Sequence, residues 1–137
     1  KGWKYQPIFE KISQSPFRDS IQHLDYLADD LVADYYQKAD VFIYPSFYEG
    51  FGLPVLEAMT LGCPVVTANT ASLPEVTGDS AILINPDNLL EIAAAIYQVI
   101  SDTSLRQELI TKGKKQAAKF SWQKTAQATI KAYRSLL

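Results

Sequence analysis

Cysteine and histidine each occur only once in this sequence of 137 residues. A single cysteine cannot form an intramolecular disulfide, so the chain is not built on a disulfide framework. Cys63 stands between Gly62 and Pro64, where we expect it to be a small buried hydrophobe. The lone His23 could act as a base, but one histidine gives little support for a histidine-based active site, and we interpret it as a structural or surface residue.

Long apolar runs are missing as well. No run approaches the roughly 18 residues that a membrane-spanning helix needs, and the first residues lack the apolar core of a signal peptide. Lys and Arg total 13 against 15 Asp and Glu, which gives a formal net charge of −2. This balance provides no overall positive field for nucleic acid or a membrane. We therefore predict a cytoplasmic protein, at most peripheral at the inner membrane face, with no nucleic-acid partner and no transmembrane segment.

Basic residues are absent from the middle of the chain, since none lies between Lys38 and Arg106. Lysines instead crowd the last quarter, where on helices they are expected to form a solvated face. An anion bound to the middle of the chain would therefore meet backbone dipoles but no cationic side chain from that segment.

The sequence does contain an alternation of strand-like and helix-like segments. Short apolar runs at residues 41–44, 64–68 and 81–85 predict strands, and a weaker pattern at 21–27 predicts another. Strands that alternate with helices indicate one α/β domain of three layers, a Rossmann-like parallel sheet with helices on both faces. The ligand site of such a sheet lies at the carboxyl ends of its strands.

Helical periodicity predicts a short helix that ends before Pro16, another from Asp29 or Asp30 to Ala39, and long helices after Asn88. Three helix starts are expected at hydroxyl residues: Ser72, Ser104 with Gln107 as a capping box, and Ser121. The last helix should carry one apolar side, made of Trp122, Ala126, Ile130, Tyr133 and Leu137. We expect Trp122 at its start to be a core residue.

The stretch from residue 41 to residue 62 predicts a strand, a glycine loop and a helix. Pro45 stops the strand, Pro54 suits the first turn of a helix, and Gly62 suits the helix end. Gly50 and Gly52 allow positive φ and let a ligand approach the backbone closely. The loop should therefore direct free backbone N–H groups and the positive end of a helix dipole toward an anion such as a phosphate.

Glu49 and Glu57 lie eight positions apart, the first in this loop and the second in the helix. Carboxylates accept hydrogen bonds from hydroxyls, so a pair that flanks a phosphate-binding turn suits a ligand with hydroxyls on both sides of its phosphates, such as a nucleotide sugar. Glycoside hydrolysis also uses two carboxylates. It requires no glycine turn or helix start between them, however, so we favour the nucleotide sugar.

The segment PSFYEGFGLPVLEAMTLGCPVV resembles the signature of the family-4 glycosyltransferases, retaining enzymes of the GT-B fold whose hallmark is E-x7-E. Glu49 and Glu57 fit this motif in register. The similarity extends through DDLVADYYQKAD before the motif and through SLPEVTGDSAILINPDN and KFSWQKTA after it, from about residue 21 to the end. It implies that residues 1–137 are the nucleotide-sugar-binding C-terminal domain of such an enzyme, without the acceptor domain.

The resemblance also implies a role for each residue of the site. Glu49 would be catalytic, beside the transferred sugar, and Glu57 would bind the ribose hydroxyls. Tyr26 and Leu27 would border the base. No metal or other cofactor is expected. The sugar hydroxyls and the diphosphate would bind to four consecutive backbone N–H groups, those of Gly50, Phe51, Gly52 and Leu53.

The sequence departs from the family pattern in what it lacks. Family members carry basic side chains for the diphosphate earlier in this domain, and by their pattern this chain begins just after the second strand, with Lys1 and Gly2 resembling the end of its glycine loop. The two missing strands would lie between those at 21–27 and 41–44. We therefore predict that another chain, such as a domain-swapped copy, fills the gap, or that these strands pair directly.

The predicted partners are a nucleoside diphosphate sugar, the N-terminal half of the parent enzyme, and a second copy of the chain. Residues 1–137 alone are expected to be inactive. Two other functions stay open: a non-catalytic nucleotide-binding or regulatory module, and one half of a GT-B sugar-nucleotide epimerase.

Overall fold

The computed structural model describes residues 5–136. The chain divides into two compact units, Lys1–Val32 and Ala33–Leu137, and each is described by itself. Helix α2 (Asp29–Lys38) begins in the first unit and ends in the second, within one residue of the predicted bounds. In the part of the chain that is described, no helix combines the length and apolar character that crossing a membrane requires. Lys1, Gly2 and Leu137, on which some of the predictions fall, lie outside the described residues.

The first unit contains helix α1 (Gln6–Gln14) and the 3₁₀ helix η1 (Arg18–Ser20). The short helix predicted before Pro16 is confirmed. His23 packs edge-on against Phe9, with ring centroids 4.8 Å apart, which agrees with a structural histidine. The strand predicted at residues 21–27 is wrong, because this segment has no regular structure. A strand forms only where a neighbour accepts its ladder of hydrogen bonds, and apolar residues alone do not provide one.

The second unit is built on a parallel sheet whose three strands lie in the order β1 (Phe42–Tyr44), β2 (Val65–Ala68) and β3 (Ala81–Ile84). All four residues of β2 are buried, as expected of an apolar strand that is covered on both faces. The strands predicted at 41–44, 64–68 and 81–85 are therefore confirmed.

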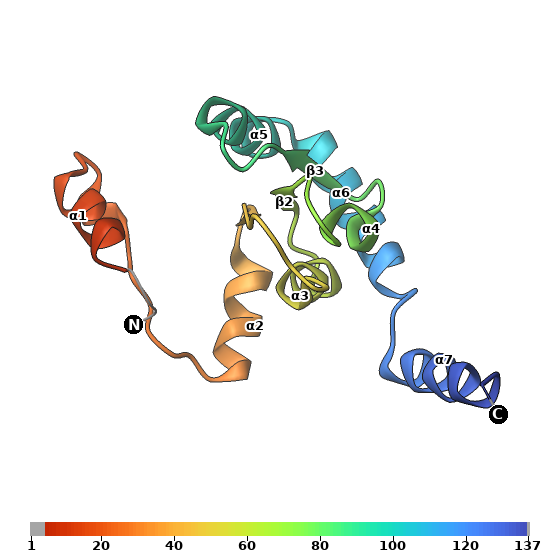
Figure 1. The fold of residues 1–137 in the computed structure, drawn as a ribbon. Coiled ribbons are helices and arrows are strands. Elements are labelled where there is room, and N and C mark those ends of the chain that lie inside the picture. Colours follow the sequence, from red (N-terminus) through yellow and green to blue (C-terminus); the bar gives the residue numbers. More distant parts are fainter. Residues whose placement is uncertain (1–4, 137) are drawn as a thin grey trace. The chain divides into compact units, whose positions relative to one another are not determined.

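Helices cover both faces of this sheet. Figure 1 shows α5 (Leu89–Ser101) on one side of the strands and α3 (Leu53–Leu61) on the other. Val55 and Met59 of α3 and Val99 of α5 are almost fully buried against the strands. The remaining helices of the unit are α4 (Leu73–Thr77), α6 (Thr103–Ala117) and α7 (Trp122–Arg134). The predicted three-layer α/β architecture is thus confirmed.

The helix starts agree with the prediction at Ser121 but not at Ser104. Ser121 caps α7 by accepting a hydrogen bond from the N–H of Lys124, at 3.2 Å. The predicted capping box at Ser104 and Gln107 is wrong, because Asp102 caps α6 and accepts from the N–H of Leu105 at 2.9 Å. Ser104 already lies inside the first turn of α6, where the N–H groups that follow it are bonded within the helix or to its cap.

Cys63 is a buried hydrophobe, as predicted. Its side chain is 2% exposed and joins the apolar core beside β2. Burial raises the pKa of the Cys63 thiol to about 11, since the low-dielectric interior disfavours the thiolate.

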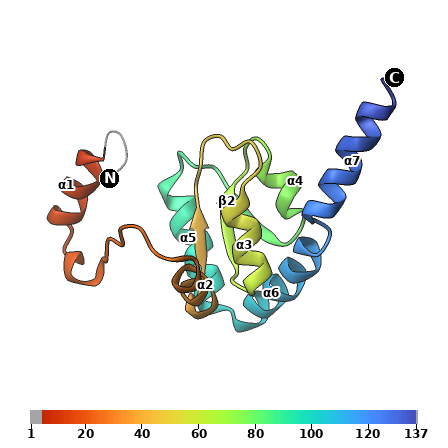
Figure 2. The ribbon, with the colours of Figure 1, turned by 90° about the horizontal axis from the view of Figure 1, so that it is seen from below.

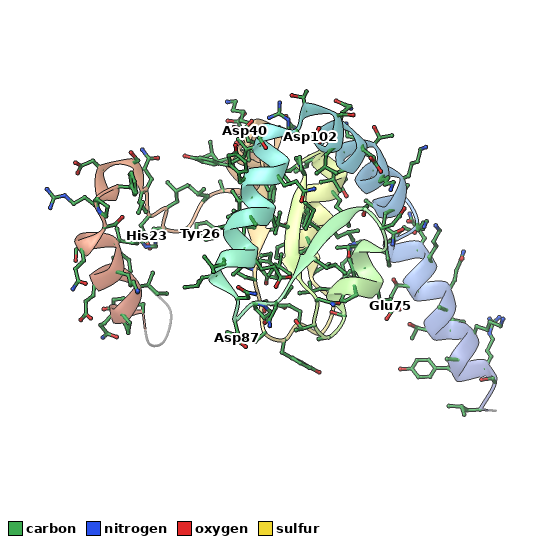
Figure 3. The ribbon with its side chains drawn as sticks, turned by 90° about the horizontal axis from the view of Figure 1, so that it is seen from above. His23, Tyr26, Asp40, Glu75, Asp87 and Asp102 are labelled. Carbon is green, nitrogen blue, oxygen red and sulfur yellow. The ribbon has the colours of Figure 1, made fainter. Side chains whose placement is uncertain are left out.

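The two ends of the sheet are marked by separate groups of acidic residues (Figure 3). Asp40 and Asp102 lie at the end where β1 begins, and Asp87 and Glu75 lie toward the opposite, carboxyl end. Asp40 forms an ion pair with Arg106, at 2.9 Å between Oδ1 and Nη1. Arg106 is therefore paired at the amino end of the sheet, where Asp40 lies.

Candidate functional site

The loop between β1 and α3, residues 45–52, lies at the carboxyl end of the strands, beside α4 (Figure 2). Pro45 follows the last residue of β1, Pro54 lies in the first turn of α3, and Gly62 ends that helix. This is the strand, glycine loop and helix that the sequence predicts, and it occupies the edge where parallel sheets bind their ligands.

Glu49 is held in this loop by two hydroxyl groups. Its Oε1 atom accepts a hydrogen bond from Tyr44 Oη at 2.7 Å and another from Ser46 Oγ at 2.8 Å. These bonds, that of Tyr44 first, lower the pKa of the Glu49 carboxyl. The bond to Glu49 is in turn the largest cause that raises the pKa of Tyr44 to about 12. Glu49 is therefore a carboxylate at neutral pH, with an oriented side chain.

The backbone that follows Glu49 presents four consecutive N–H groups without a protein acceptor. Within the described residues, no hydrogen bond leaves the backbone N–H of Gly50, Phe51, Gly52 or Leu53. The carbonyl of Gly52 does accept from the N–H groups of Val55 and Leu56, so α3 begins at this point. Free N–H groups at the start of a helix, together with its dipole, favour bound anions.

The two glycines of the loop have different physical reasons to be glycine. Gly52 has a φ of 99°, and an added Cβ would lie 2.7 Å from Leu73 Cδ2. Gly52 thus uses the positive φ that glycine allows. Gly50 does not adopt a positive φ, and its added Cβ would meet nothing within 4 Å. The space beside Gly50 is open to a ligand.

Hydroxyl groups from β2 and the segment after it fix the backbone of this loop. Thr67 Oγ1 donates to the carbonyl of Tyr44 at 2.8 Å, and Thr70 Oγ1 donates to that of Ser46 at 3.0 Å. Ser72 was predicted to cap α4, but its side chain makes no capping bond. Its hydroxyl lies 2.9 Å from the carbonyl oxygens of both Glu49 and Phe51, between which its single proton is shared.

Glu57 lies on the exposed face of α3, and no hydrogen bond or ion pair joins it to another described residue. The pKa of Tyr36 on α2 is raised, first by burial and second by the negative charge of Glu57. Glu57 lines a groove with a volume of about 480 Å³. The other residues that line the groove are Phe51, Leu53, Leu56, Thr60, Leu61, Phe120, Ser121, Trp122 and Thr125.

Trp122 is not the core residue that the sequence predicts. It is 78% exposed and forms part of this groove, while Phe120 contacts Phe51 edge-on at a centroid distance of 5.6 Å. Figure 2 shows why: α7 projects away from the sheet, and none of its described residues is buried. Helical periodicity indicates an apolar side of a helix but does not say what covers it.

The structure thus brings most of the predicted site residues into one loop and helix. Glu49 and the four N–H groups lie in the loop and at the first residue of α3. Phe51, Leu53 and Glu57 line the groove, which Glu49 does not line. Tyr26 and Leu27 belong to the first unit, where Tyr26 is 91% exposed and Leu27 is half-buried. The roles of Tyr44, Ser46 and the three hydroxyl residues that fix the loop were not predicted from the sequence. The signal that could have found them is the density of hydroxyl residues at the ends of β1 and β2 and directly after these strands.

The second unit is an α/β domain whose parallel sheet carries, at its carboxyl edge, a loop with Glu49 and unpaired backbone N–H groups. The family model for glycosyl transferases group 1 matches residues 2–116, and the chain belongs to that family. It is 40% identical over 136 residues to the O-antigen chain mannosyltransferase B of Escherichia coli, covering 99% of this chain and 36% of the relative. A serotype-specific mannosyltransferase, WbdA of Escherichia coli, is 36% identical over 120 residues, covering 88% of this chain and 15% of the relative.

Solved structures agree with this assignment. Sucrose-phosphate synthase from Thermosynechococcus elongatus superposes with a TM-score of 0.88 at 26% identity, covering 98% of this chain and 35% of that one. The C-terminal domain of a glycosyl transferase group 1 family protein from Francisella tularensis superposes with a TM-score of 0.73 at 28% identity. This match covers 83% of this chain and 60% of that one. The fold is that of the C-terminal half of the GT-B architecture, as predicted. The chain spans about a third or less of the length of the two mannosyltransferases.

Proposed function

We propose that this chain binds the donor of a retaining, family-4 glycosyltransferase, which moves a sugar from a nucleoside diphosphate sugar to an acceptor hydroxyl. The observation that carries the proposal is the run of four unpaired backbone N–H groups from Gly50 to Leu53, with Glu49 before it and Glu57 after it. These N–H groups and the dipole of α3 suit the diphosphate. The carboxylates suit hydroxyls on its two sides.

In the proposed site Glu49 accepts hydrogen bonds from the transferred sugar near its reacting carbon, and Glu57 accepts them from the ribose. When the bond between the sugar and the diphosphate breaks, positive charge develops on the sugar ring and negative charge on the leaving diphosphate. A fixed carboxylate near the ring and fixed N–H dipoles at the diphosphate stabilise these two charges at once.

The loop and helix of the proposed site carry no cationic side chain of their own for the diphosphate, because no Lys or Arg lies between Lys38 and Arg106. We infer that the countercharge comes from another part of the parent enzyme or from a second copy. Since the chain spans 36% of the length of one mannosyltransferase relative, residues 1–137 alone should bind a donor without transferring its sugar. Mannose is the sugar to test first, because that relative is named for its transfer.

Donor binding can be tested by NMR titration with UDP, GDP and their sugars. We expect the amide signals of Gly50, Phe51, Gly52 and Leu53 to shift. Glu57→Gln should weaken binding about tenfold to hundredfold, because a hydrogen bond to a charged group contributes roughly 1.5–3 kcal/mol. Glu75→Gln is the matched control, since Glu75 is an exposed carboxylate on α4. Equal affinities of the two variants would refute the assignment of Glu57.

A transfer assay separates this function from the two alternatives. The longest natural chain that contains residues 1–137 should transfer the sugar to an acceptor, and the anomeric configuration of the product should equal that of the donor. Nucleotide binding without transfer would instead indicate a binding or regulatory module. Conversion of the sugar nucleotide into its epimer without an acceptor would indicate an epimerase.

A further inference from the structure

Glu49 accepts hydrogen bonds from the described residues at only one of its two carboxylate oxygens. Oε1 accepts from both Tyr44 Oη and Ser46 Oγ, whereas Oε2 accepts from no described residue. We propose that Tyr44 and Ser46 are positioning residues, which hold Glu49 in one orientation so that Oε2 alone meets the hydroxyls of the bound sugar. This inference rests on the proposed function and deepens it.

Both donors are themselves fixed to the sheet. Tyr44 is the last residue of β1, and its carbonyl accepts from Thr67 Oγ1 of the neighbouring strand. Ser46 follows two residues later in the loop, and its carbonyl accepts from Thr70 Oγ1. The two hydroxyls thus reach Glu49 from a backbone that β2 and the segment after it hold in place.

The ring of Tyr44 is oriented by its neighbours as well. It stacks on Phe42, with centroids 5.8 Å apart and an interplanar angle of 22°. Phe42 in turn contacts Tyr36 edge-on at 5.1 Å. This row of rings leads from α2 along β1 and sets the direction of the Tyr44 hydroxyl, so the position of Glu49 depends on the packing of the domain.

Without these two bonds, Glu49 would be an ordinary glutamate on a glycine-bearing loop, with several rotamers to lose when a ligand binds. Fixing the side chain beforehand reduces that cost and keeps the negative charge where positive charge develops. Among the described residues, Tyr44 is the titratable group that bonds to Glu49. Its pKa of about 12 keeps it a hydrogen-bond donor at any physiological pH.

The first experiment needs no activity. The pKa of the Glu49 carboxyl is measured by ¹³C NMR in the longest natural chain that contains residues 1–137, with Glu49→Gln to assign the signal. We expect that pKa to rise in Tyr44→Phe and Ser46→Ala, and to stay unchanged in Tyr97→Phe, whose tyrosine lies exposed on α5. Circular dichroism verifies that each variant is folded. An unchanged Glu49 pKa in both variants would overturn the proposal.

The second experiment compares transfer kinetics in the same proteins. Tyr44→Phe should lower kcat about tenfold with little change in KM, because the lost bond orients a group that acts in the transition state. Tyr97→Phe should keep the full rate. If Glu49→Gln abolishes transfer while Tyr44→Phe and Ser46→Ala do not slow it, the positioning role is wrong and the proposed function stands. If Glu49→Gln itself leaves the rate unchanged, the proposed role of Glu49 fails.

Discussion

Substitution of Gly52 by alanine should destabilise the fold at the start of α3. Gly52 has a φ of 99°, and a left-handed conformation costs an L-residue about 1–2 kcal/mol. The new Cβ would also lie 2.7 Å from Leu73 Cδ2. Leu73 is 0% exposed, so it cannot turn away into solvent, and overpacking of this kind costs about 1–3 kcal/mol.

Alanine offsets part of this loss by reducing the entropy of the unfolded chain, by about 0.4–1 kcal/mol. We therefore expect Gly52→Ala to lower the free energy of unfolding by about 2–4 kcal/mol, which is a large part of the 5–15 kcal/mol typical of a domain. Urea denaturation followed by circular dichroism measures this directly. With a slope of about 1–3 kcal/mol per M, the midpoint should fall by about 0.7–4 M.

Gly50→Ala is the matched control for this prediction. Gly50 does not adopt a positive φ, and its new Cβ would meet nothing within 4 Å, so stability should change by no more than about 0.5 kcal/mol. The added methyl group would instead occupy space that the proposed donor uses, so Gly50→Ala should weaken donor binding in a folded protein. Equal urea midpoints for the two variants would contradict the reasoning on Gly52.

Two further predictions concern other parts of the second unit. Burial raises the pKa of Cys63 from 9.0 to about 11, so its thiol should react with a disulfide reagent at pH 8 only after unfolding. Rapid labelling of the native protein would contradict this. The stability that the protonated thiol contributes below pH 9 should be lost as the pH rises toward 11. Asp102→Ala should cost about 1 kcal/mol in urea denaturation through loss of the α6 cap, whereas Ser104→Ala should cost little; the reverse order would restore the capping box predicted from sequence.

The loop and helix around Glu49 were predictable because their determinants are local. Pro45, Gly52, Pro54 and Gly62 each impose or permit a backbone conformation at their own position, whatever surrounds them. The strand predicted at residues 21–27 has no such local determinant. Its formation depends on a neighbouring strand, which a single-chain pattern cannot supply.

The hydroxyl groups that fix the loop were not predictable in the same way. The distance along the chain is too long for a local rule, because the donors Thr67, Thr70 and Ser72 follow the carbonyls of Tyr44, Ser46 and Glu49 by 23 or 24 positions. No pattern in the sequence links these donors to those carbonyls. For Ser72 the local rule predicted a helix cap. In the fold its hydroxyl instead lies beside two carbonyls of the loop and donates to them. Local rules therefore gave the wrong partner where a distant segment came within reach.

By itself, the sequence determined the three strands, the glycine loop and the two glutamates that relate this chain to the glycosyl transferases group 1, because propensities, turn residues and motif spacing act within a few positions. Tertiary structure alone decided that Tyr44 and Ser46 share one oxygen of Glu49, that Gly50 faces open space, and that Trp122 lines a groove. These depend on which segments meet, and burial and hydrogen bonding across the fold set that outcome.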